Sequence, residues 1–192
     1  MKKLLKPIYS KLEKISPSLY FFLQYKNAAK KIQDEVNSRE QLFDNFLELC
    51  EGNKCLQIGV KENIGKKFGS NWVSVDKYDK RDFIDYNYDI HDLKFENESF
   101  DAAVCWSILE HVPDPQKAIS ELYRILKPGG KIWVQLPFLY PFHEEPKDYW
   151  RVTPDGLRIW LKDFDEIACG SDFWGNTPIV AATYFHGTKK TS

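Results

Sequence analysis

The chain has 192 residues, of which 43% are hydrophobic and 15% aromatic, so it can bury one sizeable core. Its formal net charge of −1 excludes a strong overall attraction to nucleic acid, and we expect no nucleic-acid partner. No stretch approaches the roughly 20 consecutive apolar residues that crossing a bilayer requires. We therefore expect a cytoplasmic protein without a transmembrane helix.

The N-terminal segment differs in charge from the rest of the chain. Residues 1–31 contain eight lysines and one glutamate, a net charge of +7, and their apolar residues recur at helical spacing. We expect a basic helical extension over residues 1–45, followed by an α/β domain over residues 46–192. Two roles fit this extension: a packing helix or lid whose lysines face water, or a surface that rests on an anionic membrane.

The four cysteines show no paired spacing of the C-x-x-C kind. Three of them lie in or beside apolar runs. We expect buried free thiols in a reducing compartment. The residues concerned are Cys50, Cys55, Cys105 and Cys169.

From Lys54 onward, strand-like and helix-like segments alternate, which predicts a mostly parallel sheet with helices on both faces. No helix separates the last two strands, so they are expected to pair antiparallel, with one reversed strand at or next to the sheet edge. The expected strands cover residues 54–58, 72–76, 84–89, 101–106, 131–137, 164–169 and 178–185. The expected helices cover residues 61–68, 115–126 and 154–162.

Ligands of such sheets bind beyond the carboxyl ends of the strands. Gly59 follows the first strand, and Asp76 ends the second, 17 residues later. A carboxylate at this position can accept hydrogen bonds from the vicinal hydroxyls of a ribose. The other interpretation is a solvent-facing acid in a turn, because the sequence "DKYDKRD" is crowded with charges.

The stretch "YDIHDLKFENESFDAAVCWSILEHVPDPQKAISELYRILKPGG" carries several short motifs at once, among them Ser99-Phe100-Asp101 and Leu109-Glu110-His111. With these offsets, residues 54–187 resemble the class I S-adenosylmethionine-dependent methyltransferases of the type 11 group. The resemblance implies a Rossmann-like class I fold with a seven-stranded sheet. It also implies S-adenosyl-L-methionine as the cofactor.

The same resemblance assigns roles to residues in this stretch. Asp89 would bond the adenine amino group, the Ile90 backbone N–H would meet a ring nitrogen, and Trp106 would face the cofactor. Glu110 is expected to bond local backbone and His111 to pack near a helix start, with no metal site. The "KPGG" sequence is expected to form a turn.

The glycine-rich loop departs from the pattern of the family. Where the family has acid-x-Gly-x-Gly-x-Gly, this chain has Gln57, Gly59 and Lys61. Gln57 can still accept a hydrogen bond from the methionine ammonium, although a neutral acceptor costs about 1 to 1.5 kcal/mol. The departure leaves open a catalytically inactive methyltransferase-fold protein that binds or regulates a partner. A dinucleotide oxidoreductase fits less well, because its pyrophosphate needs several glycines.

The run "PFLYPFHEEPKDYWRVTPDGLRIWL" resembles a subgroup found with glycan and cell-envelope biosynthesis. That resemblance implies a small-molecule, sugar or lipid-linked saccharide acceptor. O-methylation needs a base, for which His143 is the first candidate and Asp148 the second.

The residues that follow form a candidate substrate-binding set. Arg151 could clamp a phosphate or carboxylate of the acceptor. The competing interpretation is a packed corner before a helix capped near Thr153. The set consists of Tyr149, Trp150 and Arg151.

Overall fold

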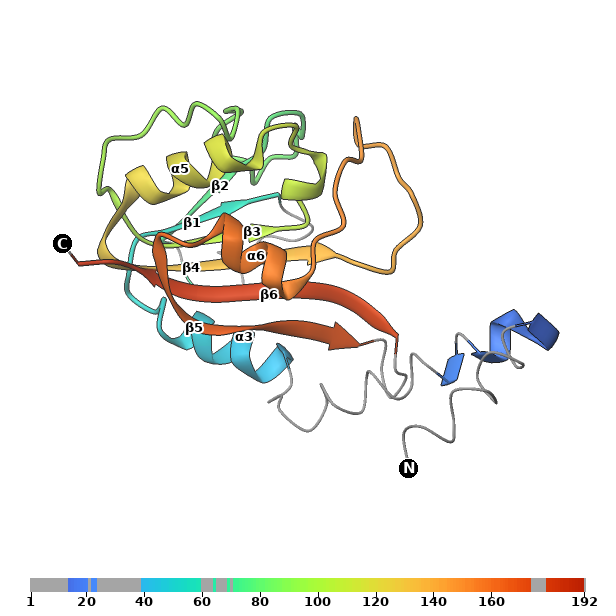
Figure 1. Ribbon diagram of the computed structural model, residues 1–192. Coiled ribbons are helices and arrows are strands. Elements are labelled where there is room, and N and C mark those ends of the chain that lie inside the picture. Colours follow the sequence, from blue (N-terminus) through green and yellow to red (C-terminus); the bar gives the residue numbers. More distant parts are fainter. Residues whose placement is uncertain are drawn as a thin grey trace.

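The computed structural model shows one mixed sheet in the part of the chain that it describes, flanked by helices (Figure 1). The described residues are 14–20, 22–23, 39–59, 64, 69, 71–173 and 179–191. The sheet has six strands in the order β2-β1-β3-β4-β6-β5. The strands are β1 Cys55–Ile58, β2 Trp72–Val75, β3 Phe100–Trp106, β4 Leu126–Pro137, β5 Phe164–Phe173 and β6 Val180–Lys189.

The pairing directions confirm the predicted arrangement of a mostly parallel sheet with a reversed strand next to its edge. β1 pairs parallel with β2 and β3, and β3 pairs parallel with β4. β6 runs antiparallel to both β4 and β5. The carboxyl ends of β1, β2, β3 and β4 therefore lie at the same end of the sheet.

The seventh strand, expected near residues 84–89, is not a strand. Only an isolated parallel bridge between Val75 and Tyr86 remains of it. A few backbone hydrogen bonds join the two segments, among them Asp76 N to Tyr86 O at 3.2 Å. Side chains add to them: the Asp85 carboxylate accepts from Ser74 N at 2.7 Å, and the Asn87 amide donates to Asp76 O at 2.8 Å. The expected helix near 61–68 lies almost wholly outside the described residues.

The predicted "KPGG" turn lies inside β4. The β3–β4 register jumps from Phe100 opposite Leu126 to Ala102 opposite Lys131, so the intervening residues bulge out of the ladder. Gly129 has φ +74°, a conformation that favours glycine.

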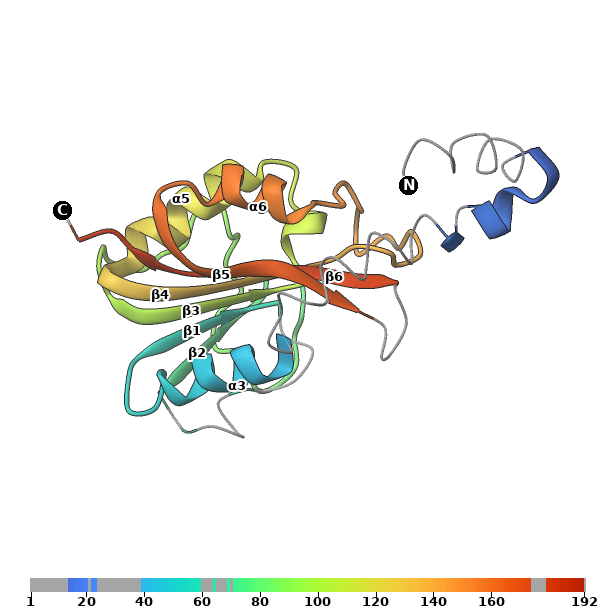
Figure 2. The same ribbon diagram turned by 60° about the horizontal axis from the view of Figure 1, so that its bottom comes forward.

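Helices cover both faces of the sheet (Figure 2). α5 Pro115–Ile125 and α6 Pro154–Trp160 lie on one face, and α3 Arg39–Glu48 lies on the other. Asp114 caps α5 by accepting from Lys117 N. Thr153 caps α6 by accepting from Gly156 N, which confirms the predicted cap near Thr153.

The α3 helix joins the N-terminal part of the chain to the sheet. Phe46 and Leu47 are buried, and the Phe46 ring lies 5.8 Å from that of Trp133 on β4. The predicted domain boundary at residue 45 falls within this helix. All four cysteines are free thiols and three are fully buried, which confirms the prediction of unpaired thiols. Within the described residues, no helix has the length and apolar character needed to span a membrane.

We predict that His186 makes the fold sensitive to acid. His186 on β6 is only 4% exposed, its ring lies 5.2 Å from that of Phe46, and burial lowers its pKa to about 4. Between pH 6.5 and pH 4 the unfolded chain therefore binds a proton that the folded chain does not. The free energy of unfolding should fall as pH drops through this window, by about 2 kcal/mol between pH 7 and pH 5. Urea unfolding at both pH values measures the loss.

The variant His186→Leu should lack this contribution, because leucine does not titrate. Its free energy of unfolding should change less between pH 7 and pH 5 than that of the parent protein. Equal pH dependence in the two proteins would contradict the assignment.

Candidate functional site

An open cleft of 1720 Å³ lies where the parallel strands end. Its lining includes most of the residues that the sequence analysis selected, whereas Gln57, Asp148, Trp150 and Arg151 are not part of it. The selected residues that line the cleft are Gly59, Asp76, Asp89, Ile90, Trp106, His143 and Tyr149.

Gly59 allows the chain to pass very close to the segment after β3. Its φ is +73°, and a Cβ atom there would lie 1.7 Å from Cγ1 of Ile108 and 3.0 Å from the carbonyl oxygen of Trp106. No other residue fits without displacing that segment.

Gln57 is buried in the sheet rather than presented to the cleft. Its Nε2 donates to Ser74 Oγ at 2.7 Å, and its Oε1 accepts from Ile64 N at 3.0 Å. Both ends of the amide are thus occupied in tying β1 to β2 and to the segment that follows β1. The structure does not place this side chain where the sequence analysis expected a contact to the methionine ammonium. Lys61 lies outside the described residues.

Asp76 lines the cleft directly after β2. Its Oδ1 accepts from Tyr78 N at 2.8 Å and from Asp79 N at 2.9 Å, which closes a turn. Oδ2 accepts no hydrogen bond from the described residues. The two interpretations of Asp76 are therefore compatible, because one oxygen holds the turn and the other is available to a ligand.

Asp89 is surrounded by donors that sequence reasoning missed. Its Oδ1 accepts from His91 N at 2.9 Å and faces His91 Nδ1 at 2.7 Å, while Oδ2 lies 2.8 Å from Lys77 Nζ. Partial burial raises the pKa of Asp89, but the hydrogen bonds from Lys77 and His91 outweigh it and hold the pKa well below its usual range. The carboxylate is ionised at neutral pH and retains a lone pair on Oδ2.

Trp106, which lines the cleft, packs against two residues of α3. Its ring packs edge-on against Phe43 at 4.8 Å, and the Arg39 guanidinium lies 5.4 Å from the ring centroid. Arg39 also forms an ion pair of 3.0 Å with Asp172 at the end of β5. Arg39 and Asp172 line the cleft, and no motif in the sequence marks either residue.

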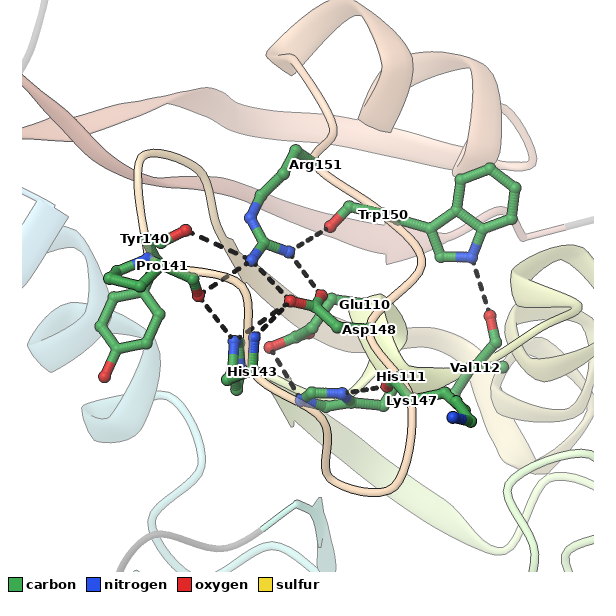
Figure 3. A network of polar contacts seen from close by, with 10 residues as sticks. All are labelled: Glu110, His111, Val112, Tyr140, Pro141, His143, Lys147, Asp148, Trp150 and Arg151. Carbon is green, nitrogen blue, oxygen red and sulfur yellow. Dashed lines mark hydrogen bonds and ion pairs between the residues drawn. The ribbon is translucent and has the colours of Figure 1, made fainter.

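Asp148 and Arg151 hold the loop that follows β4 (Figure 3). Two Arg151 nitrogens lie 2.6 and 2.8 Å from the two Asp148 oxygens, and Arg151 also donates to Tyr140, Pro141 and Trp150 carbonyls. The bond from Arg151 holds the pKa of Asp148 well below its usual range. Asp148 is thus a poor base, and the Arg151 guanidinium already has partners of its own.

Trp150 belongs to the same packed corner. Its indole N–H donates to Val112 O at 2.8 Å, and its ring meets Trp160 edge-on at 5.9 Å. Tyr149 donates its backbone N–H to Glu110 O at 2.7 Å and leaves its half-exposed ring in the cleft. Of the predicted substrate-binding set, only Tyr149 faces the cleft.

His143 lies against His111 and beside Glu110 (Figure 3). The two imidazole rings meet edge-on at 4.8 Å, and His143 Nδ1 is 3.3 Å from Asp148 Oδ2. Glu110 is fully buried, and neither carboxylate oxygen has a hydrogen-bond partner in the described chain. Burial raises the pKa of Glu110 to about 8. The backbone bonds expected of its side chain are not formed.

Comparisons with known proteins agree with this geometry. Residues 68–134 match the model of a methyltransferase domain. The chain is 29% identical over 137 residues to a demethylmenaquinone methyltransferase of Oceanobacillus iheyensis, which covers 65% of this chain and 56% of that protein. It is 42% identical over 52 residues to a ubiquinone biosynthesis O-methyltransferase of Pseudomonas putida. This match covers 27% of this chain and 20% of that protein. The chain thus spans little more than half of the first relative's length.

Solved structures share the fold. A 1,6-didemethyltoxoflavin-N1-methyltransferase of Burkholderia thailandensis, with bound S-adenosylhomocysteine, superimposes with a TM-score of 0.63 at 12% identity, covering 99% of this chain and 89% of that one. An S-adenosylmethionine-dependent methyltransferase of Methanosarcina mazei gives 0.54 at 16% identity, covering 79% and 98%. The strand order and these neighbours show that the chain has the fold of the class I S-adenosylmethionine-dependent methyltransferases, and residues 68–134 match a methyltransferase domain.

Proposed function

We propose that this protein transfers a methyl group from S-adenosyl-L-methionine to an oxygen or nitrogen atom of a small molecule. The observation that carries the proposal is one cleft that contains the acids Asp76 and Asp89 on one side and His143 on the other. The match of residues 68–134 to a methyltransferase domain and the S-adenosylhomocysteine bound to the Burkholderia neighbour of the same fold support it.

The cofactor side of the cleft offers groups that match adenosine. Asp76 Oδ2 can accept from ribose hydroxyls, and Asp89 Oδ2 can accept from the adenine amino group beside Lys77. The Ile90 N–H makes no hydrogen bond to another described residue and can donate to a ring nitrogen. Gly59 allows the backbone to approach the methionine end, whereas Gln57 is buried in the sheet and does not line the cleft.

The acceptor side offers a base. His143 Nδ1 lies 3.1 Å from Pro141 O, which fixes the proton on Nδ1 and leaves the lone pair on Nε2. Nε2 takes the acceptor proton, the acceptor lone pair attacks the methyl carbon, and the carbon–sulfur bond breaks with its electrons going to sulfur. Asp148, at 3.3 Å from Nδ1, stabilises the resulting imidazolium as a positioning residue.

The acceptor we propose is a sugar, a lipid-linked saccharide or another ring-bearing small molecule. Tyr140 and Tyr149 line the cleft next to His143 and suit contact with a ring. The relatives named for demethylmenaquinone and for ubiquinone biosynthesis also take small molecules.

The alternative is a methyltransferase-fold protein without catalytic activity that binds or regulates a partner. The specific observation in its favour is Gln57, which is buried in the sheet, bonds Ser74 Oγ and Ile64 N, and does not line the cleft. Titration with the cofactor product separates the two functions.

Isothermal titration with S-adenosylhomocysteine is expected to show one binding site. Asp89→Asn should weaken binding about tenfold, because a neutral acceptor replaces a charged one at a cost of about 1 to 1.5 kcal/mol. Asp92→Asn is the matched control, since Asp92 pairs only with the exposed Lys94 and does not line the cleft. Absence of binding by the parent protein would favour the inactive alternative.

Arg151 is expected to act on stability rather than on an anionic acceptor. Asp148 is 2% exposed, so Arg151→Met removes its guanidinium partner and leaves this buried carboxylate with the His143 donors alone among the described residues, which should cost about 3 kcal/mol of unfolding free energy in urea. Arg158→Met is the control, because Arg158 pairs with Asp155 and Glu166, whose side chains are 91% and 37% exposed, and losing exposed pairs should change stability by less than about 1 kcal/mol. Equal effects of the two substitutions would refute this role.

We also propose that the basic extension contacts an anionic membrane surface. Ile15, Leu19 and Phe22 lie at helical spacing and are 75%, 48% and 52% exposed, so an apolar stripe faces outward beside a segment of charge +7. A packing helix would bury this stripe.

Flotation with vesicles that contain anionic phospholipid tests the contact. The protein should float with these vesicles at low salt and dissociate at high salt, because the attraction is screened within about a nanometre. Phe22→Asp should reduce binding. A protein that stays in the pellet fraction at low salt would exclude the membrane role.

A further inference from the structure

Three potential metal ligands converge at the acceptor side of the cleft (Figure 3). Glu110 and His111 come from the short 3₁₀ helix η1 Leu109–His111, and His143 comes from the loop after β4. One ligand atom from each residue lies within 4.8 Å of the others. All three residues line the cleft.

The Glu110 carboxylate is buried without a hydrogen-bond partner among the described residues. It is 0% exposed, and both of its oxygens are without a hydrogen-bond partner in the part of the chain that the structure describes. Burying a carboxylate without a partner costs several kcal/mol, so buried carboxylates are generally paired or bound to metal. The nearest printed contact is His111 Nε2, at 3.7 Å from Oε1, which is too long for a hydrogen bond.

Both imidazoles have the tautomer that a metal ligand requires. His111 Nδ1 lies 2.6 Å from Lys147 O, and His143 Nδ1 lies 3.1 Å from Pro141 O. A carbonyl oxygen only accepts, so each Nδ1 carries the proton and each Nε2 keeps its lone pair. Histidines that bind metals typically donate their other ring N–H to a backbone carbonyl in this way.

We propose that Glu110, His111 and His143 bind a divalent transition-metal cation such as Zn²⁺. Two imidazoles and one carboxylate form the three-ligand set of an open zinc site, with a further position facing the cleft. Nitrogen ligands disfavour Mg²⁺ and Ca²⁺, which prefer oxygen. Bonds of about 2.0 to 2.1 Å place tetrahedral ligands about 3.3 Å apart, so the cation draws the side chains together.

This inference extends the proposed function. A cation at this point binds an acceptor oxygen as a Lewis acid and lowers the pKa of an acceptor hydroxyl. With its Nε2 bound to the cation, His143 no longer acts as the base, and the acceptor hydroxyl passes its proton to solvent water in the open cleft. That consequence rests on the proposed methyl transfer, whereas the metal site itself does not.

Titration of the chelator-treated full chain with Co²⁺ tests the site, because visible absorption reports cobalt bound by nitrogen and oxygen ligands. We expect one equivalent of bound Co²⁺ that Zn²⁺ displaces and Mg²⁺ does not. Glu110→Gln and His143→Ala should each weaken binding by at least the roughly 10- to 100-fold that loss of even an indirect partner causes. His91→Gln is the control and should bind as the parent does, since His91 contacts Asp89 and not this cluster.

Failure to bind Co²⁺, or binding that neither Glu110→Gln nor His143→Ala weakens, would overturn the proposal. A thermal shift with S-adenosylhomocysteine on each variant shows that the variant is folded. If the protein binds Co²⁺ but does not bind S-adenosylhomocysteine, the metal site is supported and the proposed function is refuted.

Discussion

Parallel pairing of β2, β1, β3 and β4 is the constraint on which the site depends. It brings the carboxyl ends of four strands to one end of the sheet, so that acids after β2 and a histidine after β4 share a cleft. The close approach of Gly59 to Ile108 requires this arrangement, because these residues follow neighbouring strands. The reversed β6 then fills the place between β4 and β5 without a crossover helix between β5 and β6.

The two sides of the cleft are built in different ways. On the cofactor side, Asp76 closes a turn through Oδ1 and has no described donor on Oδ2. Asp89 accepts from His91 through Oδ1 and from Lys77 through Oδ2, which retains a lone pair. On the acceptor side, the Asp148–Arg151 pair fixes the loop, and this loop places His143 against His111 and Glu110. The Asp148–Arg151 pair, which does not line the cleft, therefore stabilises the loop, whereas His143 from the same loop lines the cleft.

The sequence predicted the sheet and the strand-end positions well, because apolar periodicity and strand-end polar residues are local signals. It predicted a strand over residues 84–89, where the structure has one isolated bridge at Tyr86 and where the Asp85 and Asn87 side chains also bond the β2 backbone. It assigned Gln57 and Arg151 to ligands, yet tertiary partners occupy both. Lys77, His91 and Arg39 were missed because only the fold brings them to the cleft, and the pairing of His143 with Glu110 depends on a loop path that no motif encodes.

The central claim is that the acids after β2 and before β3 hold an adenosine in this cleft. A crystal structure of the protein soaked with S-adenosylhomocysteine measures it most directly. The account predicts ribose hydroxyls within about 2.7 to 3.2 Å of the Asp76 carboxylate and the adenine amino group equally close to Asp89. A nucleoside bound elsewhere, or electron density for a protein side chain filling that part of the cleft, would contradict it.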